Sequence, residues 1–314
     1  MKKYLFTLAA AAALLMTGCN DHDKEPSLSG NQDESIAIPE DMEIAFPDPN
    51  FRSYVLSKFD TDHDGRISTE EAASEAVAVM IVDDANIYSL EGIQYFIHLK
   101  DLYCYGNQLT SLDLSKNTAL TRLECGLNQL TSLDVSNSTV LEWLDCNNNQ
   151  LTSLDVSKNT ALVELNFTAN QLTSLDVSQN TALTQLWCGG NQLTSLDVSN
   201  NSVLESLNCN FNQLTSLDVS NNTALTKLYC DDNQLTSLDV SQNTALEVLY
   251  CGKNQLTSLD VSKTSIGNVR NGVLQCYMPS LEVLYLKQDW NINGINNNRS
   301  NLLIHPDTRI EYKE

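Results

Sequence analysis

Basic side chains are scarce in this sequence of 314 residues. Lysine and arginine together number 18 against 40 aspartates and glutamates, so the formal net charge at pH 7 is −22. Nucleic acids and anionic membrane surfaces are bound by clustered positive charge. We therefore expect neither nucleic acid nor an anionic lipid surface among the partners of this protein.

A membrane-spanning run is also missing, because the apolar stretch Tyr4–Met16 is shorter than the about 20 residues that a spanning helix needs. This stretch follows Lys2 and Lys3 and ends just before Cys19. A charged start, a short apolar stretch and small residues are typical of a secretory signal. Residues 1–18 are therefore predicted to direct export.

Cys19 directly follows small residues, an arrangement that resembles the lipobox of bacterial lipoproteins. The resemblance implies that the Cys19 thiol is acylated and anchors an exported protein at the bacterial outer membrane or cell surface, with no other membrane contact. The alternative is an ordinary secreted protein with an incidental cysteine. Residues 19–45 are rich in acidic residues and serine, with few apolar side chains, and are predicted to form a flexible acidic tether.

The sequence does contain an internal repeat. From Leu99 onward it aligns with itself every 21 residues, and each unit reads LxxLxCxxNQLTSLDVSxNTA. Fixed self-similarity predicts a solenoid, and apolar residues at i, i+3 and i+5 with asparagine at i+8 have the spacing of leucine-rich repeats. The recurring asparagines are Asn107, Asn128, Asn149, Asn170, Asn191, Asn212, Asn233 and Asn254.

This unit, with cysteine in the third apolar position, resembles the IRREKO subclass of bacterial leucine-rich repeats. Residues 77–99 fit one longer coil, in which Ser89–Ile93 resembles the first repeat of internalin-like proteins. The resemblance implies a β-rich solenoid of parallel strands in register over 77–261. Because both halves of the unit share the apolar spacing, we expect both sides of each coil to be extended.

The repeat loses its register after Val261. Residues 262–314 are expected to form an irregular last coil and a C-terminal cap. In this segment Leu281–Leu286 would resume the strand, and Arg309–Tyr312 would close the core, because a terminal repeat must present a polar outer face.

Seven cysteines share one position of the repeat, and an eighth, Cys276, falls in the irregular segment. Val82, Phe167 and Leu286 were assigned to the same position, which indicates that it requires an apolar group rather than sulfur. Reduced, buried thiols are therefore expected, not disulfides or a zinc site. A recurring aspartate, such as Asp134, is expected to be exposed and bonded to hydroxyls or backbone amides.

Residues 60–71 match the calcium-binding loop of an EF-hand. Ca²⁺ takes about six to eight oxygen ligands. The proposed ligands are the side chains of Asp60, Asp62 and Asp64, the Arg66 carbonyl, Ser68 or its water, and the bidentate carboxylate of Glu71. Apolar spacing predicts an entering helix through Phe51, Val55 and Phe59, and an exiting helix from Glu70 to about Ala78.

Because a single such loop is visible, we expect a structural Ca²⁺ in a small α-helical cap formed by residues 46–76. The alternative is an acidic turn that holds no ion.

The two halves of the repeat differ in how much they vary. The LTSLDVS half is nearly constant, whereas the outward positions of the LxxLxC half change from coil to coil. Amphipathic aromatics on a rigid scaffold are typical of interfaces. The alternative is drift on an unconstrained surface. The predicted ligand-binding residues are Tyr103, Trp143, Trp187, Tyr229, Tyr250 and Tyr285.

Catalytic motifs are absent from the sequence. The four histidines are scattered, and no glycine-rich phosphate loop occurs. We therefore expect a monomeric cell-surface binding or adhesion module, not an enzyme, with a protein, peptide or glycan ligand. The alternative is a glycan-processing or other hydrolytic accessory enzyme that uses the paired carboxylates of Glu124 and Asp145, one coil apart on the strand face.

Overall fold

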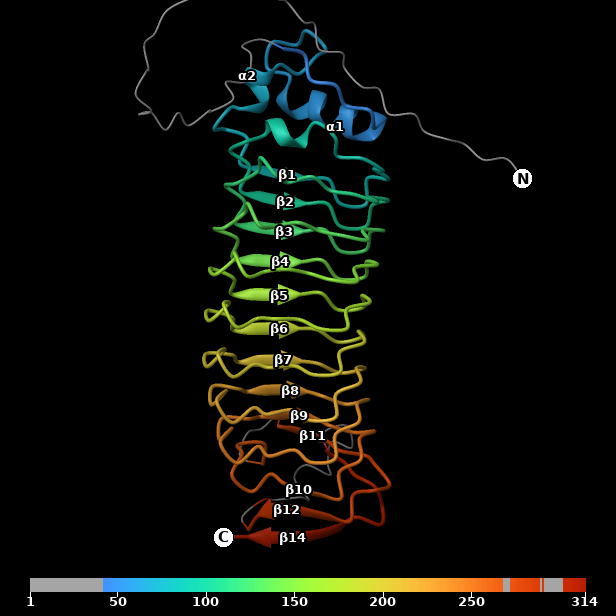
Figure 1. Ribbon diagram of the computed structural model, residues 1–314, viewed down its shortest axis with the longest axis vertical. Coiled ribbons are helices and arrows are strands. Elements are labelled where there is room, and N and C mark those ends of the chain that lie inside the picture. The colour runs from blue at the N-terminus through green and yellow to red at the C-terminus, as the bar shows by residue number, and fades with distance from the viewer. Residues whose placement is uncertain (1–41, 268–271, 289, 291–301) are drawn as a thin grey trace, which may run out of the picture. The chain divides into compact units, whose positions relative to one another are not determined.

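Stacked coils form the body of the protein, and two short helices close its N-terminal end (Figure 1). The computed structural model describes residues 42–267, 272–288, 290 and 302–314. The signal segment, Cys19 and most of the tether lie outside the described residues. No helix in the described part is long and apolar enough to cross a membrane.

The helical cap comprises α1 (Pro49–Phe59) and α2 (Thr69–Ala72). The predicted entering helix is confirmed, with Phe51 and Val55 fully buried. The exiting helix is shorter than expected, because a turn in which the Val77 N–H donates to the Ser74 carbonyl leads the chain into β1. A single 3₁₀ turn, Ile93–Tyr95, follows in the first coil.

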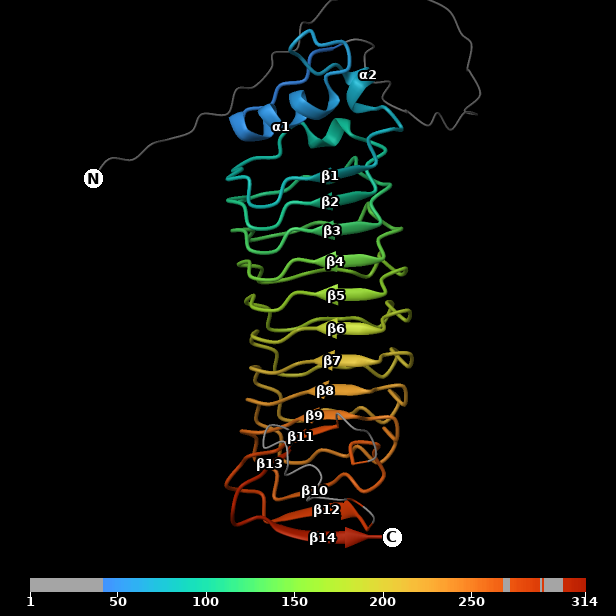
Figure 2. The ribbon, with the colours of Figure 1, turned by 180° about the vertical axis from the view of Figure 1, so that it is seen from behind.

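One strand from each coil joins an 11-stranded sheet, in which all neighbouring strands are parallel (Figures 1 and 2). The registers advance by 21 residues through the repeats and by 22 from Met80 to Leu102, as predicted. The strands are β1 (Val79–Ile81), β2 (Asp101–Tyr103), β3 (Arg122–Glu124), β4 (Trp143–Asp145), β5 (Glu164–Asn166), β6 (Gln185–Trp187), β7 (Ser206–Asn208), β8 (Lys227–Tyr229), β9 (Val248–Tyr250), β11 (Val273–Gln275) and β13 (Leu302–Leu303).

The middle residue of the repeat strands, usually leucine, and the residue two positions after it, usually cysteine, point into the core. Leu123 and Cys125, for example, are both fully buried. The cysteines of the described residues are free thiols. Burial raises the pKa of repeat cysteines such as Cys104 and Cys209, with nearby charge adding to the effect, and brings that of Cys209 to about 12. These thiols therefore stay protonated at neutral pH and behave as small apolar side chains.

Asparagine side chains fasten each coil to the coil before it. The Nδ2 of Asn128 donates to the carbonyls of Cys125 and Cys104, each at 3.0 Å, and its Oδ1 accepts from the N–H of Leu109 at 3.0 Å. The same pattern recurs down the stack, so a turn that is buried in the core leaves none of these groups without a partner.

The constant half of each coil, which was expected to be extended, forms no hydrogen-bonded strand over most of the described stack. Asn149 Oδ1 accepts a hydrogen bond from the Leu130 N–H, at the point where a second ladder of strand pairing would begin. A second, three-stranded sheet forms only at the C-terminal end, from β10 (Ser258–Asp260), β12 (Val283–Lys287) and β14 (Arg309–Lys313).

The segment expected to be irregular contains a coil of its own. Strand β11 pairs with β9 and places Leu274 opposite Leu249, 25 residues on. The Cys251 N–H donates to the Gln275 carbonyl, so Cys276 continues the cysteine position and is not outside it. The Leu-x-Cys spacing of Leu274 and Cys276 was the signal for this coil.

This extra coil moves the following strand to the other side of the solenoid. Tyr285 lies opposite Asp260 in β10, and Leu286 falls opposite Tyr312 of β14. The assignments of Tyr285 to the variable strand face and of Leu286 to the cysteine position are therefore wrong. The expected closing strand is confirmed, since β14 pairs with β12 along its length.

Asp48 joins the helical cap to the first coil. Its carboxylate is fully buried and accepts four backbone N–H groups. Oδ1 caps α1 through Asn50 and Phe51, at 2.8 and 2.9 Å, and Oδ2 accepts from Tyr88 and Ser89, at 2.6 and 3.3 Å. Asp48 was not predicted from the sequence, although an aspartate before Pro49 and an apolar helix is a recognised start signal.

We predict that Asp48→Ala lowers the free energy of unfolding by about 3 kcal/mol, because it removes a helix cap and leaves buried N–H groups without partners. Chemical unfolding followed by circular dichroism measures the loss. Asp134→Ala, which removes an exposed carboxylate with one backbone N–H partner, is the control and should cost far less. Equal losses would contradict this role for Asp48.

Candidate binding face and calcium loop

The strand face consists of the outward side chains of the 11-stranded sheet, two from each three-residue strand. Strand register places the first of each pair in one column and the second in another. The first column includes Arg122, Trp143, Glu164 and Lys227, and the second includes Tyr103, Glu124, Asp145, Asn166, Trp187, Tyr229 and Tyr250. Five of the six predicted binding residues therefore lie on one face.

The aromatic residues of this face form groups. Arg122 links the first group, because its guanidinium lies 4.8 Å from the Trp143 ring centroid and donates to the Tyr103 hydroxyl at 3.1 Å. In the second group, the ring centroids of Tyr229 and Tyr250 are 5.1 Å apart. Trp187 lies on a strand between the two groups. The structural role of Arg122 was not foreseen from the sequence.

The carboxylates Glu124 and Asp145 lie on adjacent strands in register. Burial, followed by the charges of Asp145 and Asp83, raises the pKa of Glu124. Asp145 accepts hydrogen bonds from the Asn147 N–H and the Asn166 amide, at 3.0 and 2.9 Å. The pair thus forms part of a hydrogen-bonded row on the surface, with a local excess of negative charge.

A left-handed backbone residue follows each of the strands β1 to β9 at the same place, two residues after the cysteine position. Its φ is +50° at Leu127 and +49° at Phe211, although neither residue is glycine. Each such residue costs on the order of 1 kcal/mol, and both side chains are exposed. Large apolar groups therefore project from one border of the strand face, a feature that the repeat pattern alone did not reveal.

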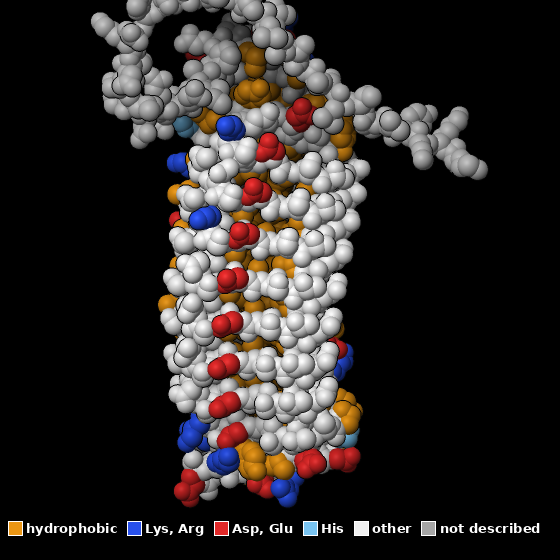
Figure 3. Space-filling view, in the orientation of Figure 1, with side chains coloured by type: hydrophobic (Ala, Val, Ile, Leu, Met, Phe, Trp, Pro, Cys, Tyr) orange, Lys and Arg blue, Asp and Glu red, His pale blue; other side chains and the backbone are white. Residues whose placement is uncertain are grey.

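The constant half of the repeat carries a regular row of acidic side chains along the solenoid (Figure 3). Asp134 is exposed and accepts the Ser136 N–H at 2.9 Å. Hydrogen bonds from the Ser136 backbone and then its hydroxyl lower the pKa of Asp134, despite burial and repulsion from Asp155. The prediction of exposed aspartates bonded to neighbouring hydroxyls and amides is confirmed.

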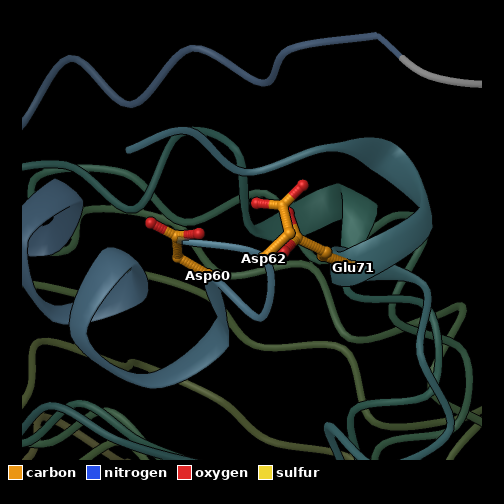
Figure 4. Close-up of side chains that lie close together, drawn as sticks. All are labelled: Asp60, Asp62 and Glu71. Atoms are coloured by element: carbon orange, nitrogen blue, oxygen red, sulfur yellow. The ribbon is translucent and has the colours of Figure 1, made fainter. Parts of the chain in front are cut away.

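The predicted calcium ligands other than Asp60 line a cavity of about 570 Å³. Carboxylate oxygens of Asp60, Asp62 and Glu71 lie within 4.8 Å of one another (Figure 4). Asp64, Arg66 and Ser68 belong to the same loop, where Asp64 and Ser68 accept hydrogen bonds from nearby backbone N–H groups. Asp64 Oδ1 accepts the Arg66 N–H at 2.8 Å, and the Ser68 hydroxyl caps α2 through the Glu71 N–H at 3.1 Å.

Glu71 holds the two ends of this loop together. Oε1 accepts the Thr61 N–H at 2.7 Å, and Oε2 accepts the Ser68 N–H at 3.0 Å. Burial opposes ionisation, but these bonds and those from both hydroxyls outweigh it and lower the pKa to about 2. Glu71 is thus ionised throughout the neutral range, as a calcium ligand must be.

The segment 42–44 pairs with the exit of the loop. The Ile44 N–H donates to the Ile67 carbonyl at 2.9 Å, and the Thr69 N–H donates to the Met42 carbonyl at 3.1 Å. The chain itself therefore supports the loop, which needs no second loop beside it. Such a support favours a structural role for the loop.

Comparison with known proteins places the repeats among leucine-rich-repeat proteins. The family described as Leucine Rich repeats (2 copies) matches residues 223–264. No curated protein matches the chain. Among solved structures, the functional domain of InlJ from Listeria monocytogenes, which includes a cysteine ladder, is 38% identical with a TM-score of 0.60. The match covers 77% of this chain and 55% of the InlJ chain.

Two further solved structures share the fold. Internalin C2 from Listeria monocytogenes is 23% identical with a TM-score of 0.54, and the match covers 72% of this chain and 93% of that one. The ectodomain of the receptor kinase GASSHO1/SCHENGEN3 from Arabidopsis thaliana is 25% identical with a TM-score of 0.56, covering 68% and 27% of the two chains. The latter was solved in complex with CASPARIAN STRIP INTEGRITY FACTOR 2.

The aspartate row should make stability depend on pH. The folded pKa of Asp134, Asp155 and Asp176 lies below the usual 3.8, so their contribution is present above that pH and is lost as the pH falls below it. We predict that the triple Asp→Asn variant at these positions is less stable than the parent at pH 7. An amide oxygen accepts these hydrogen bonds more weakly than a carboxylate does.

Thermal unfolding at pH 7 and at successive values down to pH 2 measures the difference in melting temperature between parent and variant. This difference in melting temperature should become smaller below pH 3.8. A gap that stays constant across this range would show that the aspartates do not contribute through ionisation.

Proposed function

We propose that this leucine-rich-repeat solenoid, which is similar to internalin-like proteins, is a cell-surface binding or adhesion module whose variable strand face recognises a protein, peptide or glycan. The proposal rests on one observation. Side chains that vary from coil to coil occupy adjacent columns of one sheet, whereas the opposite half of the repeat stays constant.

The aromatic groups of this face favour binding. From the likeness to the functional domain of InlJ we infer a binding module and not an enzyme. Tyr103, Trp143, Trp187, Tyr229 and Tyr250 offer large contact area on a rigid sheet, at a small entropic cost. Tyr285 is not part of this proposal, because it lies in the other sheet.

The location that we propose follows from the sequence pattern at the N-terminus. Acylation of Cys19 would anchor the protein at the bacterial outer membrane or cell surface, with the acidic tether between lipid and cap. Strand-face recognition does not depend on this anchor, and either can be tested without the other.

We also propose that the cap binds a structural Ca²⁺. Asp60 Oδ1 is buried without a hydrogen-bond partner, as suits a ligand atom awaiting a cation. Asp60, Asp62, Asp64 and Glu71 would hold the ion by their carboxylates, with oxygens of Arg66 and Ser68. A divalent cation would neutralise carboxylates that otherwise repel one another at the top of the solenoid.

The binding proposal predicts that Trp187→Ala weakens capture of a partner by about thirtyfold or more, since loss of a central anchor costs at least about 2 kcal/mol. The parent protein first identifies a partner by pull-down, and calorimetry then compares the variants. Ser174→Ala is the control on the constant half. Equal affinities of the two variants would place the site elsewhere.

The calcium proposal predicts that Ca²⁺ raises the melting temperature of the parent but not of Glu71→Ala, because the variant lacks the bidentate ligand. Calorimetric scans with Ca²⁺ and with a chelator provide the measurement. Glu75→Ala, an exposed change outside the loop, should respond like the parent. An equal response in Glu71→Ala would remove the site from this loop.

A further inference from the structure

An aromatic pocket lies at the C-terminal end of the strand face. It has a volume of about 290 Å³, and its walls include Phe211, Tyr250, Tyr277 and Leu303. Gly252 allows the turn at Tyr277 to approach closely, because a Cβ there would meet the Tyr277 carbonyl oxygen at 3.3 Å. The pocket is thus a concave, largely apolar feature on a face that is otherwise a shallow sheet.

Two carboxylates line this pocket, and only one of them is paired with its lysine. Lys253 Nζ lies 3.0 Å from both carboxylate oxygens of Asp232. Asp231 is half-buried beside them, and no ion pair within the described residues joins it to a cation. Burial and the neighbouring Asp232 raise the pKa of Asp231, whereas a backbone hydrogen bond and the charge of Lys253 lower it in part.

The aromatic walls complement a cation of planar shape. Tyr250 is held by its contact with Tyr229, and Tyr277 lies 5.3 Å from the ring of His305. Lys253 lies 5.8 Å from the Phe211 ring centroid, so a cation already occupies one of these faces. A guanidinium can bond a carboxylate through two N–H groups and stack on an aromatic ring at the same time.

We propose that this pocket receives an arginine side chain of a protein partner, with Asp231 as its carboxylate and Tyr250 and Tyr277 as its aromatic walls. This inference rests on the proposed strand-face binding and specifies the chemistry of the partner. The excess of acidic residues elsewhere on the face, including Asp83, Glu124 and Asp145, would attract the same basic partner and align it along the sheet.

The test uses the full-length protein and two small probes, N-acetylarginine amide and the uncharged N-acetylcitrulline amide, which has nearly the same shape. Tyrosine ring signals in NMR titrations at low salt report binding. We expect a dissociation constant on the order of 1 mM for the arginine amide, typical of a single side chain, and at least about tenfold weaker binding of the citrulline amide.

Two variants should change the affinity of the pocket for the arginine amide in opposite directions. Asp231→Asn keeps the shape and should weaken binding of the arginine amide by about tenfold. Lys253→Met removes a competing cation and should strengthen it, a gain that general damage to the fold would not produce. Asp134→Asn, on the opposite half of the repeat, should leave the affinity unchanged.

Equal affinity for the two amides, or no effect of either pocket variant, would overturn the assignment. Failure of the pocket proposal can be distinguished from failure of the proposed function. If Trp187→Ala abolishes capture of the partner while Asp231→Asn does not, strand-face binding stands and the arginine pocket falls. If capture survives both changes, the strand face itself is not the binding surface. A glycan as the captured partner would also overturn the pocket proposal.

Discussion

The structure depends on the hydrogen bonds by which a buried asparagine joins each coil to its predecessor. In the recurring geometry of Asn128, one amide binds carbonyls of two successive coils and accepts an N–H of the earlier one. A second asparagine column, represented by fully buried Asn159, ties the other corner by donating its amide to the Val135 and Ser138 carbonyls of the preceding coil. Because these asparagines join the coils at both corners, the leucines and cysteines need only fill the core. The outward side chains of the strands contribute little to holding the coils together.

This division of labour explains why the two halves of the repeat differ. The constant half uses its aspartate and serine to shape the turn, as Asp134 and Ser136 do, so its polar residues are structural. The strand half satisfies its backbone within the sheet, which leaves residues such as Arg122 and Trp143 available for contacts with each other and with a partner. An exposed surface of this kind can change without disturbing the core beneath it.

Periodicity made much of this architecture predictable, because one correct register fixes every coil that shares it. The solenoid, α1, the outward aromatics of β2 to β9 and the clustered Asp60, Asp62 and Glu71 all followed from spacing. Features that occur once were harder to foresee. Asp48 acts through a contact with Tyr88, 40 residues away, and the coil around Leu274 has a length of its own, so Tyr285 was assigned to the wrong sheet. Neither feature leaves a repeated signal.

Because the coils stack, their number can change without changing the two ends of the solenoid. The cap contacts the first coils and the second sheet closes the last ones, while the 21-residue units between them contact chiefly their neighbours. Loss or duplication of one unit would therefore leave both ends intact and change the separation between the Trp143 group and the Tyr250 group by about 4.8 Å. Recombination between nearly identical repeats can thus change the length of the binding surface in fixed steps.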